Sequence, residues 1–347
     1  MPKDLVKLKS VGMEMSSKNR SASFLMVDQS VRLISRYIPS GLEIMNLKEA
    51  LKKYDWLDDY MWKIVEEEGD FDGYFIRALK NSRISFPVEA CLYLKRIKTQ
   101  KVHNIIIAEE NSEIDIITGC TSERLSGLHL GISEFFIKRG ARVSFTMIHN
   151  WEKDVEVFPK TGIIVEEGAT FINNYVLLSP VKKVKAYPFA ILEKDARAFF
   201  NSIVAAFENS DIDIGNKVVL KGKGSCAEIV SRCISKGGRV TTRGYIVAES
   251  EGVRGHLECR GMIIGGGTIH AIPELEARNP NVDLSHEAAI GKIAEDEIFY
   301  LMSRGLSRDE AVSLIIRGFM DVDIKDIPDI LKREIEKAVK IVEKDLL

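Results

Sequence analysis

The chain has 347 residues, of which 45% are hydrophobic and 29% charged, and its formal net charge is -2. These values are typical of a soluble globular protein with about two domains or one long repeat array. The low net charge argues against a general nucleic-acid or anionic-membrane surface. Because no run approaches ~20 apolar residues and the first residues lack the apolar core of a secretion signal, we expect a cytoplasmic protein.

The first and last parts of the chain are expected to be helical. In residues 1–82, Asn46 and Glu49 form a capping box ahead of apolar residues at helical spacing. In residues 291–347, Gly305 is expected to end one helix, and Ser307 with Glu310 forms a second capping box. The segment IPDILKREIEKAVKIVEKDLL then has the apolar stripe of an amphipathic helix that begins at its proline.

Residues 83–290 contain many short runs rich in β-branched residues, such as HNIIIAEENSEIDIITG and GRVTTRGYIVAES. Glycine-containing turns such as EEGA, ESEG and GGG separate these runs, and no helical segments lie between them. These turns are not hairpin signals of the Asn-Gly kind. We therefore predict a mainly β fold with a parallel β-helix core and helical segments at both ends, with a β-sandwich as the alternative.

Five cysteines are spread over a chain without a CxxC motif, so structural disulfides are not expected. Cys226, Cys233 and Cys259 fall within 34 residues, and Glu287 follows Cys259 by 28 residues. Since positions one coil apart stack in a solenoid, these side chains are expected on one surface, together with His286 as a further candidate. Thiolates with a carboxylate or an imidazole suit iron or an iron-sulfur cluster. The alternative that each cysteine is a small buried apolar residue remains open.

Other chemistries find little support in the sequence. The glycine-rich stretches KGKGSC and IIGGGT lack the spacing of a phosphate-binding P-loop, so any ATP site must belong to another chain. There is no GxSxG motif. A β-helical carbohydrate-active enzyme would need a groove of carboxylates and aromatic side chains, and only 8% of the residues are aromatic.

Five blocks of the sequence carry a resemblance to a known family. They are NRSASFLMVDQSV, GYFIRALKNSRISFPVEA, GCTSERLSGLHLGISEFFIKRGARVSFTMIHNW, SRCISKGGRVTTRGYI and NPNVDLSHEAAIGKIAEDEIFYLMSRGLSRDEAVSLIIRGF. The blocks resemble the SufB/SufD family, the scaffold proteins of the SUF system for iron-sulfur cluster assembly. The resemblance runs over roughly residues 10–325 and implies a right-handed parallel β-helix flanked by helical segments. It also implies an ABC-type ATPase partner, SufC, that docks on the C-terminal helices, so that the ATPase activity resides in the partner and this chain is not itself an enzyme.

Carried over position by position, the resemblance assigns roles to four residues. The SHEA sequence looks like the SufB version of its block, and Cys259 matches the SufB cysteine on which a cluster is built. Glu287 matches the carboxylate beside that cysteine, with His286 as its neighbour. Cys120, in TGCTS, matches a cysteine implicated in receiving persulfide sulfur.

The chain also departs from larger SufB proteins. It lacks their N-terminal cysteine-rich motif, and it has Cys233 where relatives typically have serine, with Cys226 nearby. These extra thiols would replace ligands that a SufD partner provides elsewhere, which fits a compact archaeal-type scaffold working as a homodimer.

The resemblance thus implies a scaffold that builds a 2Fe-2S or 4Fe-4S cluster from a sulfur donor and passes it to apo-proteins. It leaves open the cluster type, a heterodimer with a paralogue, and the use of a flavin. The alternative within the family is a SufD-like subunit that binds SufC without holding a cluster.

Overall fold

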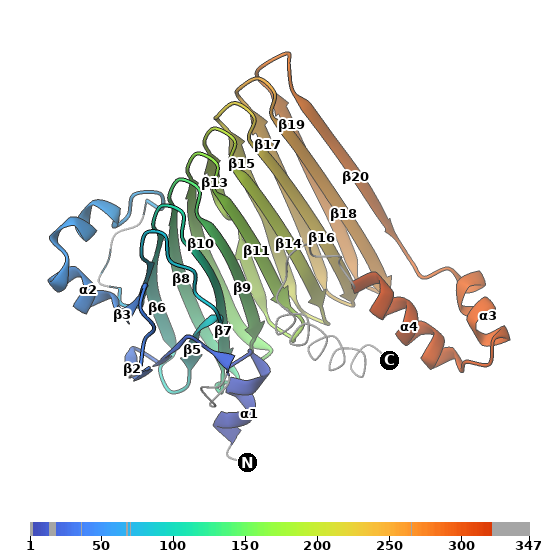
Figure 1. Cartoon of the computed structure of the whole chain (residues 1–347). Helices are drawn as coiled ribbons and strands as arrows, with labels where there is room; N and C mark the ends of the chain where they lie inside the picture. Colours follow the sequence, from blue (N-terminus) through green and yellow to red (C-terminus); the bar gives the residue numbers. More distant parts are fainter. Residues whose placement is uncertain are drawn as a thin grey trace.

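The computed structural model describes residues 3–13, 19–35, 37–66, 69, 71–264 and 266–320. Two long sheets face each other, and from residue 88 onward the chain places strands in the two sheets in alternation (Figure 1). Sheet A consists of β2 (Ser30–Ile34), β1 (Ala22–Val27), β5 (Val88–Leu94), β7 (Glu113–Ser122), β9 (Arg142–Asn150), β11 (Thr170–Leu177), β14 (Arg197–Ala206), β16 (Cys226–Lys236), β18 (Arg254–Ile264) and β20 (Asp283–Gly291), in that order.

Sheet B lies opposite sheet A and is built in the same way. In spatial order it consists of β19 (Thr268–Ala277), β17 (Arg239–Ala248), β15 (Asp211–Leu220), the pair β12 (Lys183–Ala186) and β13 (Phe189–Leu192), β10 (Asp154–Val165), β8 (Ser126–Ile137), β6 (Thr99–Ala108), β4 (Tyr74–Ala78) and β3 (Leu42–Asn46).

Neighbouring strands of successive coils are parallel in both sheets, and only the β1–β2 and β3–β4 pairs of the described strands are antiparallel. Alternate side chains of each strand point inward and form one continuous apolar core between the sheets. The turns that the sequence indicated are present, because Gly168 of EEGA and Gly252 of ESEG have φ values of +67° and +69°. This arrangement confirms the parallel β-helix and excludes the sandwich.

The expectation of a helical region over residues 1–82 is wrong for most of that segment. The described helices there are α1 (Lys3–Ser10), α2 (Leu47–Lys53) and the 3-10 helix η2 (Asp55–Tyr60), and β1 to β4 belong to the two sheets. The capping box does begin α2, since Asn46 Oδ1 accepts the backbone N–H of Glu49 at 3.3 Å. The apolar residues that follow do not extend α2, because in η2 they pack against the outer face of sheet B.

The C-terminal helices α3 (Glu295–Ser303) and α4 (Arg308–Met320) lie at the other end of the solenoid (Figure 1). Gly305 follows α3 with a φ of +98°, and the Ser307 backbone N–H donates to Glu310 Oε2 at 2.8 Å, so both predicted helix boundaries are confirmed. Helix α4 packs Ile316 and Met320 on the outer face of sheet A. The amphipathic helix expected from Pro328 onward falls outside the described residues.

Within the described part of the chain, no helix combines the length and the apolar character needed to span a membrane.

Candidate functional site

Cys233 and Cys259 both point into the interior of the solenoid, near its C-terminal end. Cys233 is fully buried and Cys259 is 2% exposed. In the register of β16 and β18, Cys259 lies beside Ser231, and Cys233 lies beside Gly261. The two thiols are therefore on adjacent strands and on the same inward face, displaced by two residues along the strand direction.

The protein environment keeps these two thiols protonated. Burial raises the pKa of Cys233 to about 12, and the neighbouring Cys259 adds to this shift. Burial also raises the pKa of Cys259, while the hydroxyl of Thr242 lowers the pKa of both thiols. A thiophilic metal ion must therefore displace the protons before the sulfurs can ligate it.

Glu287 does not lie on the same face as Cys259. In the register of β18 and β20, Cys259 pairs with Ala288, and Glu287 pairs with Glu258 on the outer face. Because a shift of one residue moves a side chain to the opposite face, the expectation that Glu287 shares a surface with the interior thiols is wrong for the single chain. The Glu287 side chain is 58% exposed and forms an ion pair with Arg260 at 3.2 Å.

His286, by contrast, pairs with Leu257 and has the inward orientation. It is nevertheless exposed, because β20 is the last strand of sheet A among the described residues. His286 and Glu287 thus point to opposite faces of the terminal strand, as strand alternation predicts.

The outer face above the thiols carries a row of alternating charges on β16, β18 and β20. Glu258 forms ion pairs with both Arg232 and Arg260, the latter at 2.9 Å, and Arg260 also contacts Glu287. This row holds the Glu287 side chain on the outer surface by its ion pair with Arg260.

Cys226 is separate from the interior pair. It lies on the outer face at the start of β16, half-buried between Arg197 and Arg254 of the adjacent strands. Burial raises the pKa of its thiol, and the two guanidinium groups offset part of this shift. Since seven residues of extended strand span about 23 Å, Cys226 and Cys233 cannot ligate one metal ion within the chain.

Cys120 is buried in the interior, where burial raises the pKa of its thiol. Its Sγ lies 3.6 Å from Met147 Sδ, and its register neighbour is His149. The same register row continues through β11 and β14 to Cys233. Four strand spacings of about 4.8 Å place Cys120 and Cys233 about 19 Å apart along the interior.

Sequence reasoning missed two features around these cysteines. His149 Nδ1 lies 3.0 Å from the Tyr175 hydroxyl, and burial lowers the pKa of His149 to about 3. Thr242 faces the thiol pair from sheet B. In the sequence, the only signal for this position is the number of residues between Thr242 and the Gly237–Gly238 turn. Across the described residues, no three His, Cys, Asp or Glu side chains are grouped to hold a metal ion.

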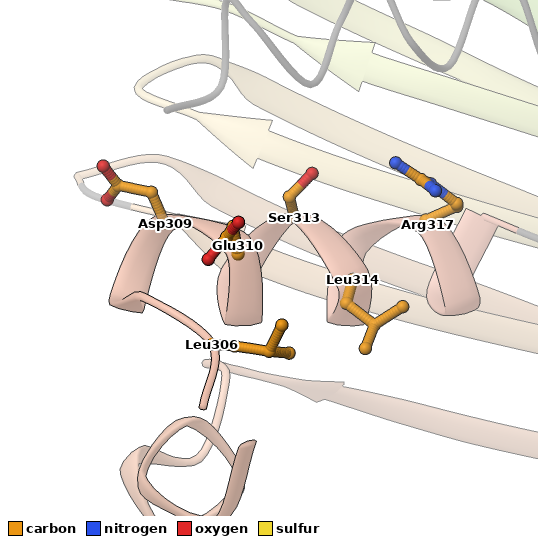
Figure 2. Close-up of a pocket in the computed structure, with 6 residues that line it drawn as sticks. All are labelled: Leu306, Asp309, Glu310, Ser313, Leu314 and Arg317. Carbon is orange, nitrogen blue, oxygen red and sulfur yellow. The ribbon is translucent and has the colours of Figure 1, made fainter. Parts of the chain in front are cut away.

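A hollow of about 350 Å³ lies along the exposed side of α4 (Figure 2). Leu306 and Leu314 form its apolar part, and the Leu314 residue is 47% exposed. Polar side chains stand around it, namely Asp309, Glu310, Ser313 and Arg317.

The chain matches the family model described as SUF system FeS cluster assembly, SufBD core domain, over residues 93–319. It is 53% identical to an iron-sulfur cluster assembly SufBD family protein of Archaeoglobus fulgidus, over 99% of this chain and 96% of that protein. A SufBD family protein of Methanothermobacter thermautotrophicus is 45% identical over 95% of this chain and 85% of its own length. The iron-sulfur cluster assembly protein SufB of Bacillus subtilis is 32% identical over 77% of this chain and 59% of its own length. The chain therefore belongs to the SufBD family of iron-sulfur cluster assembly proteins.

Proposed function

We propose that this chain is a SufB-like scaffold on which an iron-sulfur cluster is built and from which it passes to apo-proteins in the cytoplasm. The observation that carries the proposal is the pair of interior thiols, Cys233 and Cys259, on adjacent strands at the end of the solenoid. A SufD-like subunit that only binds an ATPase has no need for two facing thiols. In this proposal the cluster is cargo, and the chain is not an enzyme.

Two protein thiolates suit a cluster that must be released. Iron in such clusters is normally held by four cysteines per cluster, in addition to the bridging sulfides, so a site with two thiolates leaves two positions for other donors. Each thiol must also lose a proton before it binds iron. The affinity of the two cysteines for the cluster is therefore reduced by the free energy needed to ionise a buried thiol. Both effects favour a cluster that can be transferred.

The open end of the solenoid supports a homodimer. β19 and β20 are terminal strands of their sheets within the described chain, and their side chains Leu275 and Ile290 are exposed. Uncovered strand edges are sites of pairing with another chain. In this proposal a second copy covers the end, which brings His286 and Glu287 to the interface next to the thiols of both copies.

The ATPase partner is proposed to bind at α3 and α4. Phe299 and Tyr300 of α3 and Leu314 of α4 are exposed, and Leu314 lines the hollow shown in Figure 2. Exposed apolar side chains with a polar rim are typical of protein-protein contacts. A SufC-type ATPase bound there would supply the ATP hydrolysis for which this chain has no P-loop.

Cys120 keeps its proposed role as the residue that receives sulfur from a donor. It shares the solenoid interior and one register row with Cys233. Its burial means that a sulfur donor reaches it only when the surrounding structure opens.

Anaerobic reconstitution with iron and sulfide tests the scaffold proposal. Visible absorbance and EPR signals of a cluster are expected in the wild type and in Cys226→Ser, and strongly reduced signals in Cys233→Ser and Cys259→Ser. A colourless wild type would support the SufD-like alternative, and full cluster absorbance in Cys259→Ser would contradict the assigned site.

Co-purification with a SufC-type ATPase tests the docking surface. Leu314→Asp is expected to weaken the complex, because it places a charge in the apolar hollow on α4. Leu125→Asp is the matched control, since Leu125 is also an exposed leucine and lies far along the chain from α4. Equal recovery of the ATPase with both variants would contradict this docking site.

A further inference from the structure

Thr242 faces the two interior thiols from the opposite sheet. β16 and β17 are joined by Gly237 and Gly238, and Cys233 lies four residues before this turn while Thr242 lies four residues after it. The chain reverses at the turn, so the two side chains meet across the interior. The alternating pattern of β17 agrees, because Val240 and Ile246 point into the core and Thr242 is buried.

The Thr242 hydroxyl has no hydrogen-bond partner in the described structure. Thr242 nevertheless lies near both sulfurs, since its hydroxyl lowers the pKa of Cys233 and of Cys259, and it forms no hydrogen bond with either protonated thiol. A buried hydroxyl without a partner destabilises a fold, because it has lost its hydrogen bonds to water and gained none in return. A threonine at this position is therefore a cost to the empty protein, which a valine of the same shape would not have.

The missing partner appears when the thiols lose their protons. A neutral thiol is a weak acceptor, whereas a thiolate is charged and accepts hydrogen bonds more strongly. We propose that Thr242 is a positioning residue of the metal site, whose hydroxyl donates a hydrogen bond to the Cys233 or Cys259 thiolate once a thiophilic metal ion has replaced the thiol protons. The inference rests on the proposed function, in which that metal is the iron of the nascent cluster.

This arrangement gives Thr242 the role of the outer groups that orient metal ligands in other proteins. It fixes the rotamer of the thiolate that it contacts and holds the two sulfurs toward one metal ion. The displaced protons go to solvent, and no electron transfer is required.

Cobalt(II) binding under anaerobic conditions tests the proposal, with the sulfur-to-cobalt charge-transfer absorbance as the signal. Thr242→Val and Thr242→Ala are expected to bind cobalt about 10–100-fold more weakly than the wild type and to shift the charge-transfer band. Thr242→Ser keeps the hydroxyl and is expected to restore both the affinity and the band. Thr241→Val is the matched control, because Thr241 is the adjacent threonine on the outer face and should have no effect.

Several results would overturn the inference. One is wild-type cobalt affinity and an unshifted band in Thr242→Val and Thr242→Ala. A second is a Thr242→Ser variant as weak as Thr242→Val, and a third is an equal loss in Thr241→Val. Absence of the charge-transfer band in the wild type would also overturn it. Circular dichroism identifies a variant that has not folded, and Thr242→Ala, which only removes atoms, then replaces Thr242→Val.

The cobalt titration is independent of cluster assembly. A wild type that binds cobalt through Cys233 and Cys259 but forms no cluster with iron and sulfide contradicts the scaffold proposal. In that case the variants at Thr242 still decide whether the hydroxyl supports the thiolate pair.

Discussion

Iodoacetamide is expected to modify Cys226 much faster than Cys233 in the folded protein, although both belong to β16. The thiolate is the reactive form of cysteine. Burial raises the pKa of Cys233 to about 12 from an ordinary value of 9.0. Three pKa units reduce its thiolate population at neutral pH by about a thousandfold. Cys226 is half-buried at the surface, and two arginines offset part of the effect of burial on its pKa.

Mass spectrometry of the two cysteine-containing peptides after timed alkylation at pH 7.5 measures both rates. We expect a ratio well above tenfold, since the pKa of Cys233 is raised further than that of Cys226 and the absence of solvent contact at Cys233 adds to the difference in ionisation. In guanidinium chloride the two rates should become similar. Cys226→Ser is the control, because it should remove the fast reaction and leave the slow one unchanged.

Rates of Cys226 and Cys233 within tenfold of each other in the folded protein would refute the reasoning. Such a result would mean that Cys233 faces solvent or that the end of the solenoid opens often. The same difference from an ordinary cysteine corresponds to about 4 kcal/mol, which a metal ion must supply in addition to the normal cost of ionising a thiol. Cobalt or iron bound to Cys233 should therefore protect it from iodoacetamide for a second reason, because the metal occupies the thiolate. Removal of the metal should not make Cys233 reactive, because it remains buried.

Three further outcomes follow from the described contacts. Glu134→Gln should lower the free energy of unfolding by about 1–3 kcal/mol in guanidinium denaturation, because the buried carboxylate accepts the backbone N–H groups of Trp62 at 2.9 Å and Ile64 at 2.7 Å and shares a hydrogen bond of 2.8 Å with the buried His103, and the amide cannot accept all of these bonds. Gly119→Val should accelerate trypsin cleavage in α1, since a Cβ there would lie 2.5 Å from the Val11 carbonyl oxygen, whereas Gly291→Val, with open space around it, should not. The free energy of unfolding should not depend on the buried thiols below about pH 9 and should fall as the pH rises above it. The reason is that burial raises the pKa of these thiols in the folded state, so that the unfolded chain loses their protons first. Guanidinium midpoints from pH 7 to 11 measure this dependence.

The sequence predicted the solenoid well because its two main signals are local. Inward-facing β-branched residues repeat every second position, and glycines such as Gly168 mark the turns where a positive φ is needed. Capping boxes at Asn46 and Ser307 likewise specify where a helix begins. They do not specify where it ends, so α2 was expected to be longer than it is. The strands of residues 22–78 were missed because they are short and depend on pairing with strands later in the chain.

The sequence predicted that the cysteines form a group, but it did not predict on which face of its strand each cysteine lies. Cys226, Cys233 and Cys259 are close in the sequence, and proximity suggested one site. Strand alternation alone separates Cys226 from Cys233, since their positions on one strand differ by seven, and an odd difference places two side chains on opposite faces. Thr242 had no signal in composition or motif, because its relevance depends on the reversal of the chain at Gly237–Gly238.

The position of Glu287 shows how one additional residue between two strands changes which side chains share a face of the sheet. From β16 to β18 the register advances by 28 residues, whereas from β18 to β20 it advances by 29, and β17 to β19 has the same longer step. Two residues separate β16 from β17, and three separate β18 from β19, so the additional residue belongs to the segment between β18 and β19. Since side chains alternate with a period of two, this single residue directs Glu287 outward to Arg260. If Glu287 acts on the same cluster as Cys259, it must do so around the open end of the solenoid, where a second copy of the chain is proposed to bind.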